Sequence, residues 1–176
     1  MKKKLKSREE EVVEFLKESN AIEGVYDDDS LQQAIYAWEN ISSVNVITPS
    51  DVRRTHKTLM LHQPLMPTEK GCFRECPVYI GGREGLRHEE IRDAIDDWAD
   101  KMNGIDSWQD GLSEVYDDDE ELSKELHIQY EKIHPFIDGN GRTGRIFMNW
   151  WRLKNNLPLL IIHEVEEQIE YYKWFK

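Results

Sequence analysis

Apolar residues recur along most of this chain every three to four positions, which places them on one face of an α-helix. With the caps that flank them, these repeats predict six helices, over about residues 5–18, 31–40, 48–61, 88–103, 119–133 and 142–155. A further amphipathic stretch runs from about His163 to the end. The pattern therefore predicts a mainly α-helical fold, a helical bundle.

Local signals fix several of the predicted helix ends. Thr48 precedes Pro49 and Asp51, which gives an N-cap, a proline at the first helical position and an acid three residues after the cap. The run from Asp27 to Ser30 offers a second N-cap. Gly104 is expected to end the helix over 88–103, because glycine readily adopts the left-handed conformation found after helix C-termini.

One segment departs from the helical pattern. Pro64 and Pro67 interrupt it, and proline cannot continue a helix. The residues from Phe73 to Ile80 include the run Val78-Tyr79-Ile80 and end at Gly81-Gly82, which is typical of a short β-hairpin. We therefore expect a small hairpin on the helical bundle.

Composition limits the classes of function. The 176 residues fit one domain, and 39% hydrophobic residues are enough for a core. A net charge of −12 argues against general nucleic-acid binding, which relies on clustered Lys and Arg. No apolar run approaches the roughly 20 residues that span a bilayer, and no apolar segment follows the basic N-terminus as in a secretory signal. Cys72 and Cys76 are too few for a disulfide scaffold. We expect reduced thiols in a cytoplasmic protein without nucleic-acid or membrane partners.

The most informative chemistry lies in the twelve residues from His134 to Arg145, HPFIDGNGRTGR. Pro135 disfavours helical geometry at His134, so the preceding helix is expected to end there. Gly139 and Gly141 allow a tight turn before the next helix, which we expect to start at about Arg142. The free N–H groups and the positive dipole end of that helix face the turn. A glycine-rich turn between two helices is thus an anion-binding site.

Three kinds of side chain complete this predicted site. Arg142 and Arg145 are three residues apart, so one helix face can present both guanidinium groups to phosphate oxygens. Asp138 is a carboxylate beside the phosphate site, where Mg²⁺ is usually held. His134 can accept a proton from an attacking hydroxyl. Together they predict a site that binds a nucleoside triphosphate and activates a hydroxyl against it.

Two other nucleotide-binding patterns are excluded. The run from Gly139 to Gly144 matches G-x-G-x-x-G, but the dinucleotide-binding fold requires a strand before the first glycine. Residues 122–133 are instead predicted to be helical. The sequence also contains no G-x-x-x-x-G-K-[ST] P-loop.

The twelve residues resemble the signature HPFx[DE]GNGRxxR of the Fic (filamentation induced by cAMP) family, and they match it at every specified position. The similarity extends to the helix ending in His56-Lys57-Thr58-Leu59-Met60, to a flap hairpin within 71–82, and to the helix over 126–133. This resemblance implies the Fic fold. It also implies a protein adenylyltransferase, which transfers AMP from ATP to a Ser, Thr or Tyr hydroxyl of a target protein and releases pyrophosphate.

The resemblance assigns roles to individual residues. His134 is expected to be the general base, and Asp138 is expected to hold Mg²⁺. Arg145 is expected to reach the γ-phosphate. The other residues expected to bind the nucleotide are Gly139, Asn140, Gly141, Arg142 and Gly144. The flap residues expected to pair with an extended segment of the target are Phe73, Val78, Tyr79 and Ile80.

The run from Ser19 to Gly24, SNAIEG, resembles the family's inhibitory motif [S/T]xxxE[G/N], as in the class with an N-terminal inhibitory helix. Ser19 and Glu23 are four residues apart, so one helical turn aligns them. The resemblance implies that Glu23 pairs with Arg145, occupies the place of the γ-phosphate and leaves the α-phosphate misplaced for attack. An ordinary helix C-terminus capped by Gly24 is the alternative. We accordingly divide the chain into an inhibitory segment, 1–26, and a Fic core domain, 27–176.

The sequence leaves alternatives open. The same site could remove AMP hydrolytically, with Glu23 positioning water, or could transfer another nucleotide-derived group. A kinase-like toxin of the related Doc branch departs from the G-N-G-R core that is present here. A non-catalytic binding module would not need the full set of His134, Asp138 and Arg142. No pattern identifies the target protein or decides between a monomer and a homo-oligomer.

Overall fold

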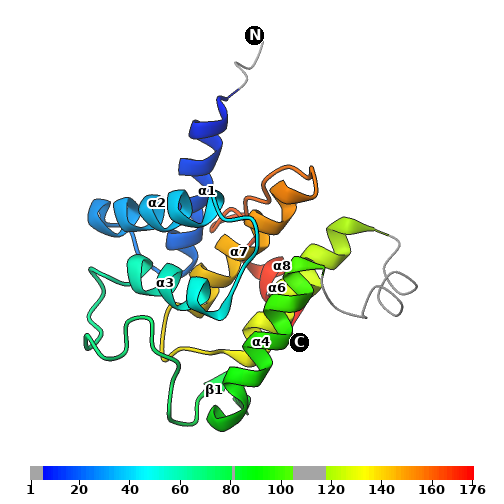
Figure 1. Cartoon of the computed structure of the whole chain (residues 1–176). Coiled ribbons are helices and arrows are strands. Elements are labelled where there is room, and N and C mark those ends of the chain that lie inside the picture. The colour runs from blue at the N-terminus through cyan, green and yellow to red at the C-terminus, as the bar shows by residue number, and fades with distance from the viewer. Residues whose placement is uncertain (1–5, 81, 105–117) are drawn as a thin grey trace.

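The computed structural model describes residues 6–80, 82–104 and 118–176. Over these residues the chain forms seven α-helices, two 3-10 helices and one pair of short strands (Figure 1). The α-helices are α1 (Arg8–Ile22), α2 (Asp28–Ser42), α3 (Pro49–Leu59), α4 (Ile91–Asn103), α6 (Asp119–Ile133), α7 (Asn140–Lys154) and α8 (Gln168–Tyr172). The strands are β1 (Tyr79–Ile80) and β2 (Arg83–Glu84), and the 3-10 helices are η1 (His88–Glu90) and η2 (Lys173–Phe175).

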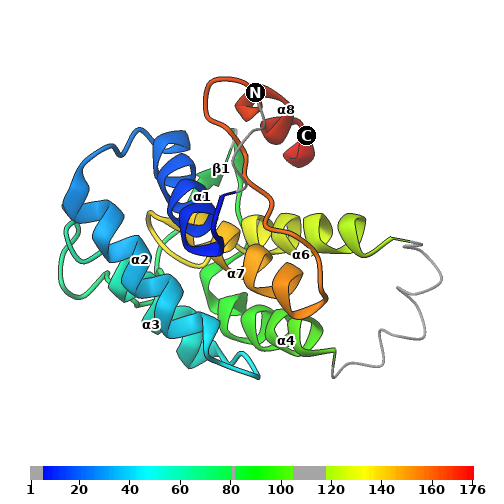
Figure 2. The same cartoon turned by 90° about the horizontal axis from the view of Figure 1, so that it is seen from above.

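The central helix of the bundle is α7. Twelve of its fifteen residues are buried, which is typical of a helix enclosed on all sides. It contacts α1, α2, α3 and α6. Figure 2 shows it between α1 and α2 on one side and α4 and α6 on the other. The residues at its N-terminus are thereby fixed by packing on several elements.

An aromatic cluster joins α4, α6 and α7 in the core. The ring centroid of Trp98 lies 4.9 Å from that of Tyr130 and 5.5 Å from that of Phe147. All three side chains are almost fully buried. The indole N–H of Trp98 donates to the carbonyl of Leu126 at 2.8 Å, so the one polar atom of this large side chain is satisfied. This cluster packs the C-terminal half of α6 against the middle of α7.

Several predicted helix ends are confirmed, and others lie at different residues than predicted. Thr48 and Asp51 form a reciprocal capping box with Pro49 in the first turn, and Gly104 ends α4 in the left-handed conformation with φ 67°. Helix α1 continues to Ile22, four residues beyond the predicted end. Helix α7 begins at Asn140 rather than Arg142.

The predicted hairpin over 73–80 is not the hairpin that forms. From Phe73 to Val78 the chain has no regular strand. Only Tyr79–Ile80 is extended, and it pairs antiparallel with Arg83–Glu84. Pro77 lacks an N–H to donate to a ladder. The guanidinium group of Arg74 bonds the carbonyls of Cys76 and Leu86 in its place.

The amphipathic stretch predicted from about His163 to the end does not form one continuous helix. Only α8 and η2 are helical in that region. The segment that precedes this stretch is held by α7, because Asn149 accepts from the N–H of Leu160 at 2.7 Å and donates to its carbonyl at 3.1 Å. Arg152 likewise donates to the carbonyl of Pro158 at 2.8 Å. These bonds hold the segment after α7 in an extended path. None of the described helices is both long and apolar enough to cross a lipid bilayer.

Candidate active site

The loop between α6 and α7 is shaped by two residues in the left-handed conformation. His134 is the C-cap of α6, with φ 48° and ψ 62°, and its N–H donates to the carbonyl of Tyr130 at 3.0 Å. Gly139 precedes α7 with φ 77°. Non-glycine residues rarely adopt positive φ, and they do so most often at functional or constrained positions. The left-handed backbone at His134 ends α6 and leads the chain into the loop.

Asn140 closes this loop with its side chain. Its Oδ1 accepts from the N–H of Phe136 at 2.9 Å, and its Nδ2 donates to the carbonyl of Phe136 at 2.9 Å. The residue is only 2% exposed. The amide of Asn140 therefore supports the loop, and only its backbone N–H remains for a ligand.

Two buried cationic or titratable side chains support the loop from outside it. The Nε2 of His56 contacts the carbonyl of Asp138 at 2.9 Å, and its Nδ1 accepts from the N–H of Gly71 at 2.9 Å, so Nε2 bears the proton. Burial lowers the pKa of His56 to about 4. The Nε of Arg74 donates to the carbonyl of His134 at 2.8 Å, which satisfies the C-terminus of α6.

The first turn of α7 is open to an anion. No side chain caps it, and the first N–H groups of a helix have no partner within the helix. Gly141 lies close to Glu23, and a Cβ at this position would overlap Oε1 of that residue. A Cβ at Gly144 would instead lie 2.8 Å from His127 and Tyr130. Gly144 thus allows close packing of α6 on α7, and the structure does not place it at the phosphate site.

Arg142 is buried with part of its guanidinium group unused. It is 2% exposed, and its Nη2 lies 3.3 Å from Sδ of Met60 and 3.9 Å from Oδ2 of Asp138. Within the described residues, its Nε and Nη1 have no hydrogen-bond partner. Burial lowers the pKa of Arg142, against the opposing effect of Asp138 and Glu23. A buried cation without full hydrogen bonding is costly unless an anion completes it.

Arg145 has the opposite environment, because every nitrogen of its guanidinium group has a partner. Its Nε donates to Oγ of Ser19 at 2.9 Å, and its Nη2 donates to the carbonyl of Ser19 and to Oε1 of Glu23, both at 2.8 Å. Its Nη1 donates to the hydroxyl of Tyr171 at 2.8 Å. Burial alone would lower the pKa of Arg145, but Tyr171 and Glu23 outweigh it and the pKa is raised. The predicted pairing of Glu23 with Arg145 is therefore present in the structure.

A carboxylate that the sequence analysis did not single out lies beside His134. Oε2 of Glu131 is 3.6 Å from Nδ1 of His134, and the two residues are three positions apart at the end of α6. The His134 side chain is 22% exposed, and that of Glu131 is 14% exposed. The spacing i, i+3 was visible in the sequence. The left-handed turn that directs His134 was not.

Asp138 has a carboxylate that is available to a ligand. Its side chain is 57% exposed, and its Oδ1 accepts from the N–H of Gly139 at 2.7 Å. The described residues contain no cluster of three or more His, Cys, Asp or Glu that could hold a metal by themselves. A single carboxylate fits Mg²⁺, which is usually bound by one or two carboxylates together with substrate phosphates.

One cavity of about 1050 Å³ brings several of these groups together, and among the described residues its lining does not include Arg142 or Arg145. Its lining includes His134, Asp138, Gly139, Asn140 and Gly141 from the loop, and Glu23 from the end of α1. Of the predicted flap residues, Ile80 also lines it. Phe73 instead packs on Phe136, with ring centroids 5.5 Å apart, and Tyr79 is 73% exposed.

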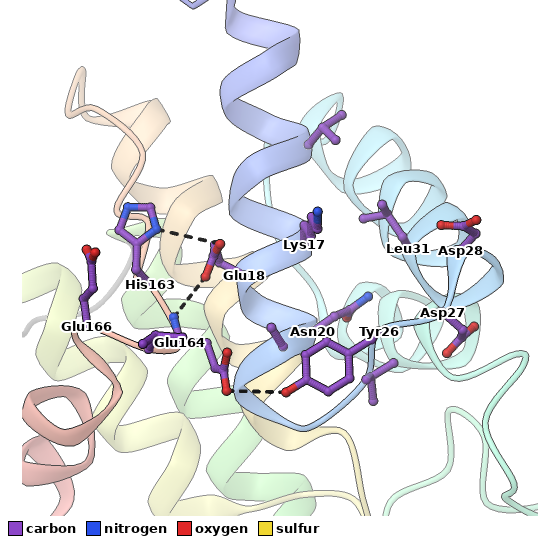
Figure 3. Close-up of a pocket in the computed structure, with 14 residues that line it drawn as sticks. Lys17, Glu18, Asn20, Tyr26, Asp27, Asp28, Leu31, His163, Glu164 and Glu166 are labelled. Carbon is purple, nitrogen blue, oxygen red and sulfur yellow. Dashed lines mark hydrogen bonds and ion pairs between the residues drawn. The ribbon is translucent and has the colours of Figure 1, made fainter.

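A second cavity, of about 710 Å³, lies beside the C-terminal half of α1 (Figure 3). Glu18 accepts from the N–H of Glu164 at 2.9 Å and lies 3.8 Å from Nδ1 of His163. The hydroxyl of Tyr26 donates to Glu164 at 3.4 Å. These contacts fix the end of α1, and Glu23 with it, to the segment that follows α7.

The helical bundle that carries this loop is shared with known proteins. The sequence pattern of the Fic/DOC family matches residues 46–151, and the chain belongs to this family. Proteins named protein adenylyltransferase Fic from Aedes aegypti and Drosophila erecta are 28% identical over 136 residues and 32% identical over 132 residues. These alignments cover 77% and 74% of this chain. The chain spans about a quarter of the length of those relatives, 25% and 24%.

Solved structures share the fold. A Fic domain containing signaling protein from Bacteroides thetaiotaomicron superimposes with a TM-score of 0.72 at 21% identity, covering 92% of this chain and 69% of that chain. Fic-1 from C. elegans superimposes with a TM-score of 0.75 at 20% identity, covering 97% and 58%. The mainly helical Fic fold is thus confirmed.

Proposed function

We propose that this chain is a protein adenylyltransferase that transfers AMP from ATP to a hydroxyl group of a target protein. The observation that supports this most directly is the shared cavity, in which His134 and Asp138 lie beside the uncapped first turn of α7. The unpaired nitrogens of Arg142 add a reason for an anion to bind there. The names of the related proteins support the same reaction.

In the proposed reaction, Nε2 of His134 accepts the proton of the attacking hydroxyl. The hydroxyl oxygen forms a bond to the α-phosphorus, the bond from that phosphorus to the bridging oxygen breaks, and pyrophosphate leaves. The backbone N–H groups at the start of α7 and the guanidinium group of Arg142 would bind the phosphates. Asp138 would hold Mg²⁺, which neutralises phosphate charge when bound. The edge formed by Tyr79–Ile80 would align an extended segment of the target through main-chain hydrogen bonds.

We further propose that α1 inhibits this reaction. Glu23 occupies Nη2 of Arg145 and lies over Gly141, so a γ-phosphate directed to Arg145 would meet a carboxylate. The two negative charges would repel each other, displace the triphosphate and misplace its α-phosphorus. This proposal places the chain in the class with an N-terminal inhibitory helix.

The test is incorporation of label from α-labelled ATP with Mg²⁺. Glu23→Gly should increase self-modification or target modification, and adding His134→Ala should reduce it by about 10²–10⁴-fold. Glu9→Gly, which removes an exposed acid from the first turn of the same helix, is the matched control and should not increase it. Equal labelling of wild type and Glu23→Gly would contradict the inhibitory role of Glu23. Labelling that survives His134→Ala would contradict the role of His134 as the base.

A second reaction is supported by the position of Glu23, which lines the same cavity as His134 and has a side chain that is 35% exposed. A carboxylate there could position a water for hydrolytic removal of AMP from a modified protein. Incubation with a pre-modified target, followed by mass spectrometry, distinguishes the two reactions. Release of AMP that depends on Glu23 would favour removal. The same spectra identify the group transferred and would reveal a donor other than ATP.

A further inference from the structure

Glu131 has no assigned role, yet its carboxylate is nearer to His134 than any other acid for which the structure gives a contact. The distance from Oε2 to Nδ1 is 3.6 Å, which is an ion-pair distance and is slightly longer than a hydrogen bond. Catalytic hydrogen bonds are often long in unliganded structures and shorten when substrate binds. Both residues line the same cavity.

The surroundings of Glu131 favour a carboxylate. The groups that act on it are His127, Tyr130 and His134 on α6, Arg145 on α7 and Tyr171 on α8. Burial alone would raise the pKa of Glu131, but its interactions with His134, His127 and Arg145 outweigh burial and lower it. Its other oxygen, Oε1, has no hydrogen-bond partner within the described residues. Nδ1 of His134 likewise has no hydrogen-bond partner within the described residues, and its polar contact there is the one with Oε2 of Glu131.

A carboxylate can only accept hydrogen bonds, so the ring nitrogen that faces it must bear a proton. With the proton on Nδ1, the lone pair of the neutral ring is on Nε2. We propose that Glu131 is a positioning residue for His134: it holds the Nδ1–H tautomer and stabilises the imidazolium formed when Nε2 accepts a proton. The second part rests on the proposed role of His134 as the base. An acid paired with the far nitrogen of a catalytic imidazole has this function in other hydrolases and transferases.

The first test does not depend on activity. Nitrogen-15 NMR of histidine-labelled protein, at a pH where the ring is neutral, reports which nitrogen of His134 bears the proton. Wild type should show mainly Nδ1–H, and Glu131→Gln should shift toward the tautomer mixture of a solvated histidine. Glu121→Gln makes the same change at an exposed position of α6 and should leave the ratio unchanged. An unchanged ratio in Glu131→Gln overturns the proposal.

The second test uses the released enzyme, Glu23→Gly. Adding Glu131→Gln should lower kcat by about 10–100-fold, the usual effect of removing a group that orients a catalytic ligand or base. The KM for ATP should not change, and the acid limb of the pH–rate profile should move to lower pH, because the imidazolium loses its stabilising charge. Glu131→Asp should recover part of kcat. A fall in kcat that Glu121→Gln reproduces, or a pH profile that does not move, contradicts the proposal.

The two tests separate this inference from the proposed function. If the tautomer shifts but no variant modifies a protein, the pairing of Glu131 with His134 stands and the transferase function fails. A thermal melt establishes that Glu131→Gln is folded. If it is not, Glu131→Asp withdraws the carboxylate by one methylene and should give an intermediate tautomer ratio, and an unchanged ratio there also overturns the proposal.

Discussion

Two buried arginines on α7 differ in how completely they are bonded. Arg152 donates from Nε to Pro158, from Nη1 to Ser123 and from Nη2 to Glu120. Arg142 is equally buried, at 2% exposed, but its Nε and Nη1 have no partner within the described residues. A satisfied buried arginine stabilises the fold, whereas an unsatisfied one lowers stability and is retained for another purpose.

Replacing each arginine by methionine should therefore have opposite effects on stability. Arg142→Met removes an uncompensated charge and keeps an apolar side chain, so the free energy of unfolding should rise by on the order of 1 kcal/mol or more. Arg152→Met leaves three acceptors without a donor and should lower it by about 2–4 kcal/mol. Urea unfolding of both variants measures the difference.

The same pair of variants tests nucleotide binding. In a Glu23→Gly background, Arg142→Met should weaken ATP binding by about 10–100-fold, the effect of losing one charge-assisted hydrogen bond. Arg152→Met should bind ATP normally if it remains folded. Calorimetric titration with ATP and Mg²⁺ provides the measurement. Wild-type affinity in Arg142→Met would assign the unpaired nitrogens to something other than phosphate.

Among the elements, the strand pair and the active-site loop are joined through one side chain. The guanidinium group of Arg74 donates to His134 and Ile133 at the end of α6 and to Cys76 and Leu86 beside the strands. Its backbone N–H donates to Pro135 at 2.9 Å. A displacement of the strand pair must therefore strain the loop that contains His134.

Arg74→Lys should loosen both parts together. A lysine ammonium cannot span four carbonyls in the planar geometry of a guanidinium group, so the free energy of unfolding should fall by about 2–4 kcal/mol. Hydrogen exchange of residues 134–138 should accelerate, while that of α2 should not. Arg92→Lys, at an exposed position of α4, is the control. Unchanged exchange in the loop would show that Arg74 supports the strands alone.

The sequence predicted those elements whose signals are local. The helix periodicity, the Thr48 capping box and the Gly104 cap depend on neighbours within a few residues, and the twelve-residue motif is contiguous. The predicted hairpin failed because the carbonyls of Cys76 and Leu86 accept hydrogen bonds from Arg74 instead of from a partner strand, and strand pairing is limited to Tyr79–Ile80 and Arg83–Glu84. The extended path just before the C-terminal stretch was not predicted, because Asn149 on α7 holds Leu160 through a tertiary contact. His56 and Tyr171 were missed because their partners are set by tertiary structure, and Glu131 was missed because the left-handed turn at His134 directs the imidazole toward it.

Across the whole molecule, segments outside the matched family region surround the end of the motif. The family pattern matches 46–151, yet every partner of the Arg145 guanidinium group lies outside it: Ser19 and Glu23 on α1, and Tyr171 on α8. The Tyr171 hydroxyl accepts from Arg145 and also lies 2.8 Å from Nε2 of His127, within hydrogen-bond distance. Segments from both sides of the matched region, one before it and one after it, thus contact the same guanidinium group.

Two buried histidines stay neutral in the folded protein, and they make the stability of the protein depend on pH. Burial lowers the pKa of His56 and of His127 to about 4, below the ordinary value of 6.5. Below pH 6.5 the unfolded chain binds protons at these rings and the folded chain does not, until the pH approaches 4. Stability is therefore complete above pH 6.5 and falls as the pH drops toward 4, by up to about 1.4 kcal/mol per pH unit for each histidine.

Urea unfolding at about pH 7 and pH 5.5 tests this, because most carboxylates remain ionised over that interval. Each histidine should account for about 1 kcal/mol of the lost stability. His127→Gln retains a polar side chain opposite Tyr171 but cannot titrate, so its stability should fall by about 1 kcal/mol less than that of wild type over the same interval. His62→Gln, at an exposed position, should keep the wild-type pH dependence. If His127→Gln also keeps it, the burial of His127 does not govern stability. In that case the contacts of His127 with Tyr171, and of Tyr171 with Arg145, persist when the imidazole is charged.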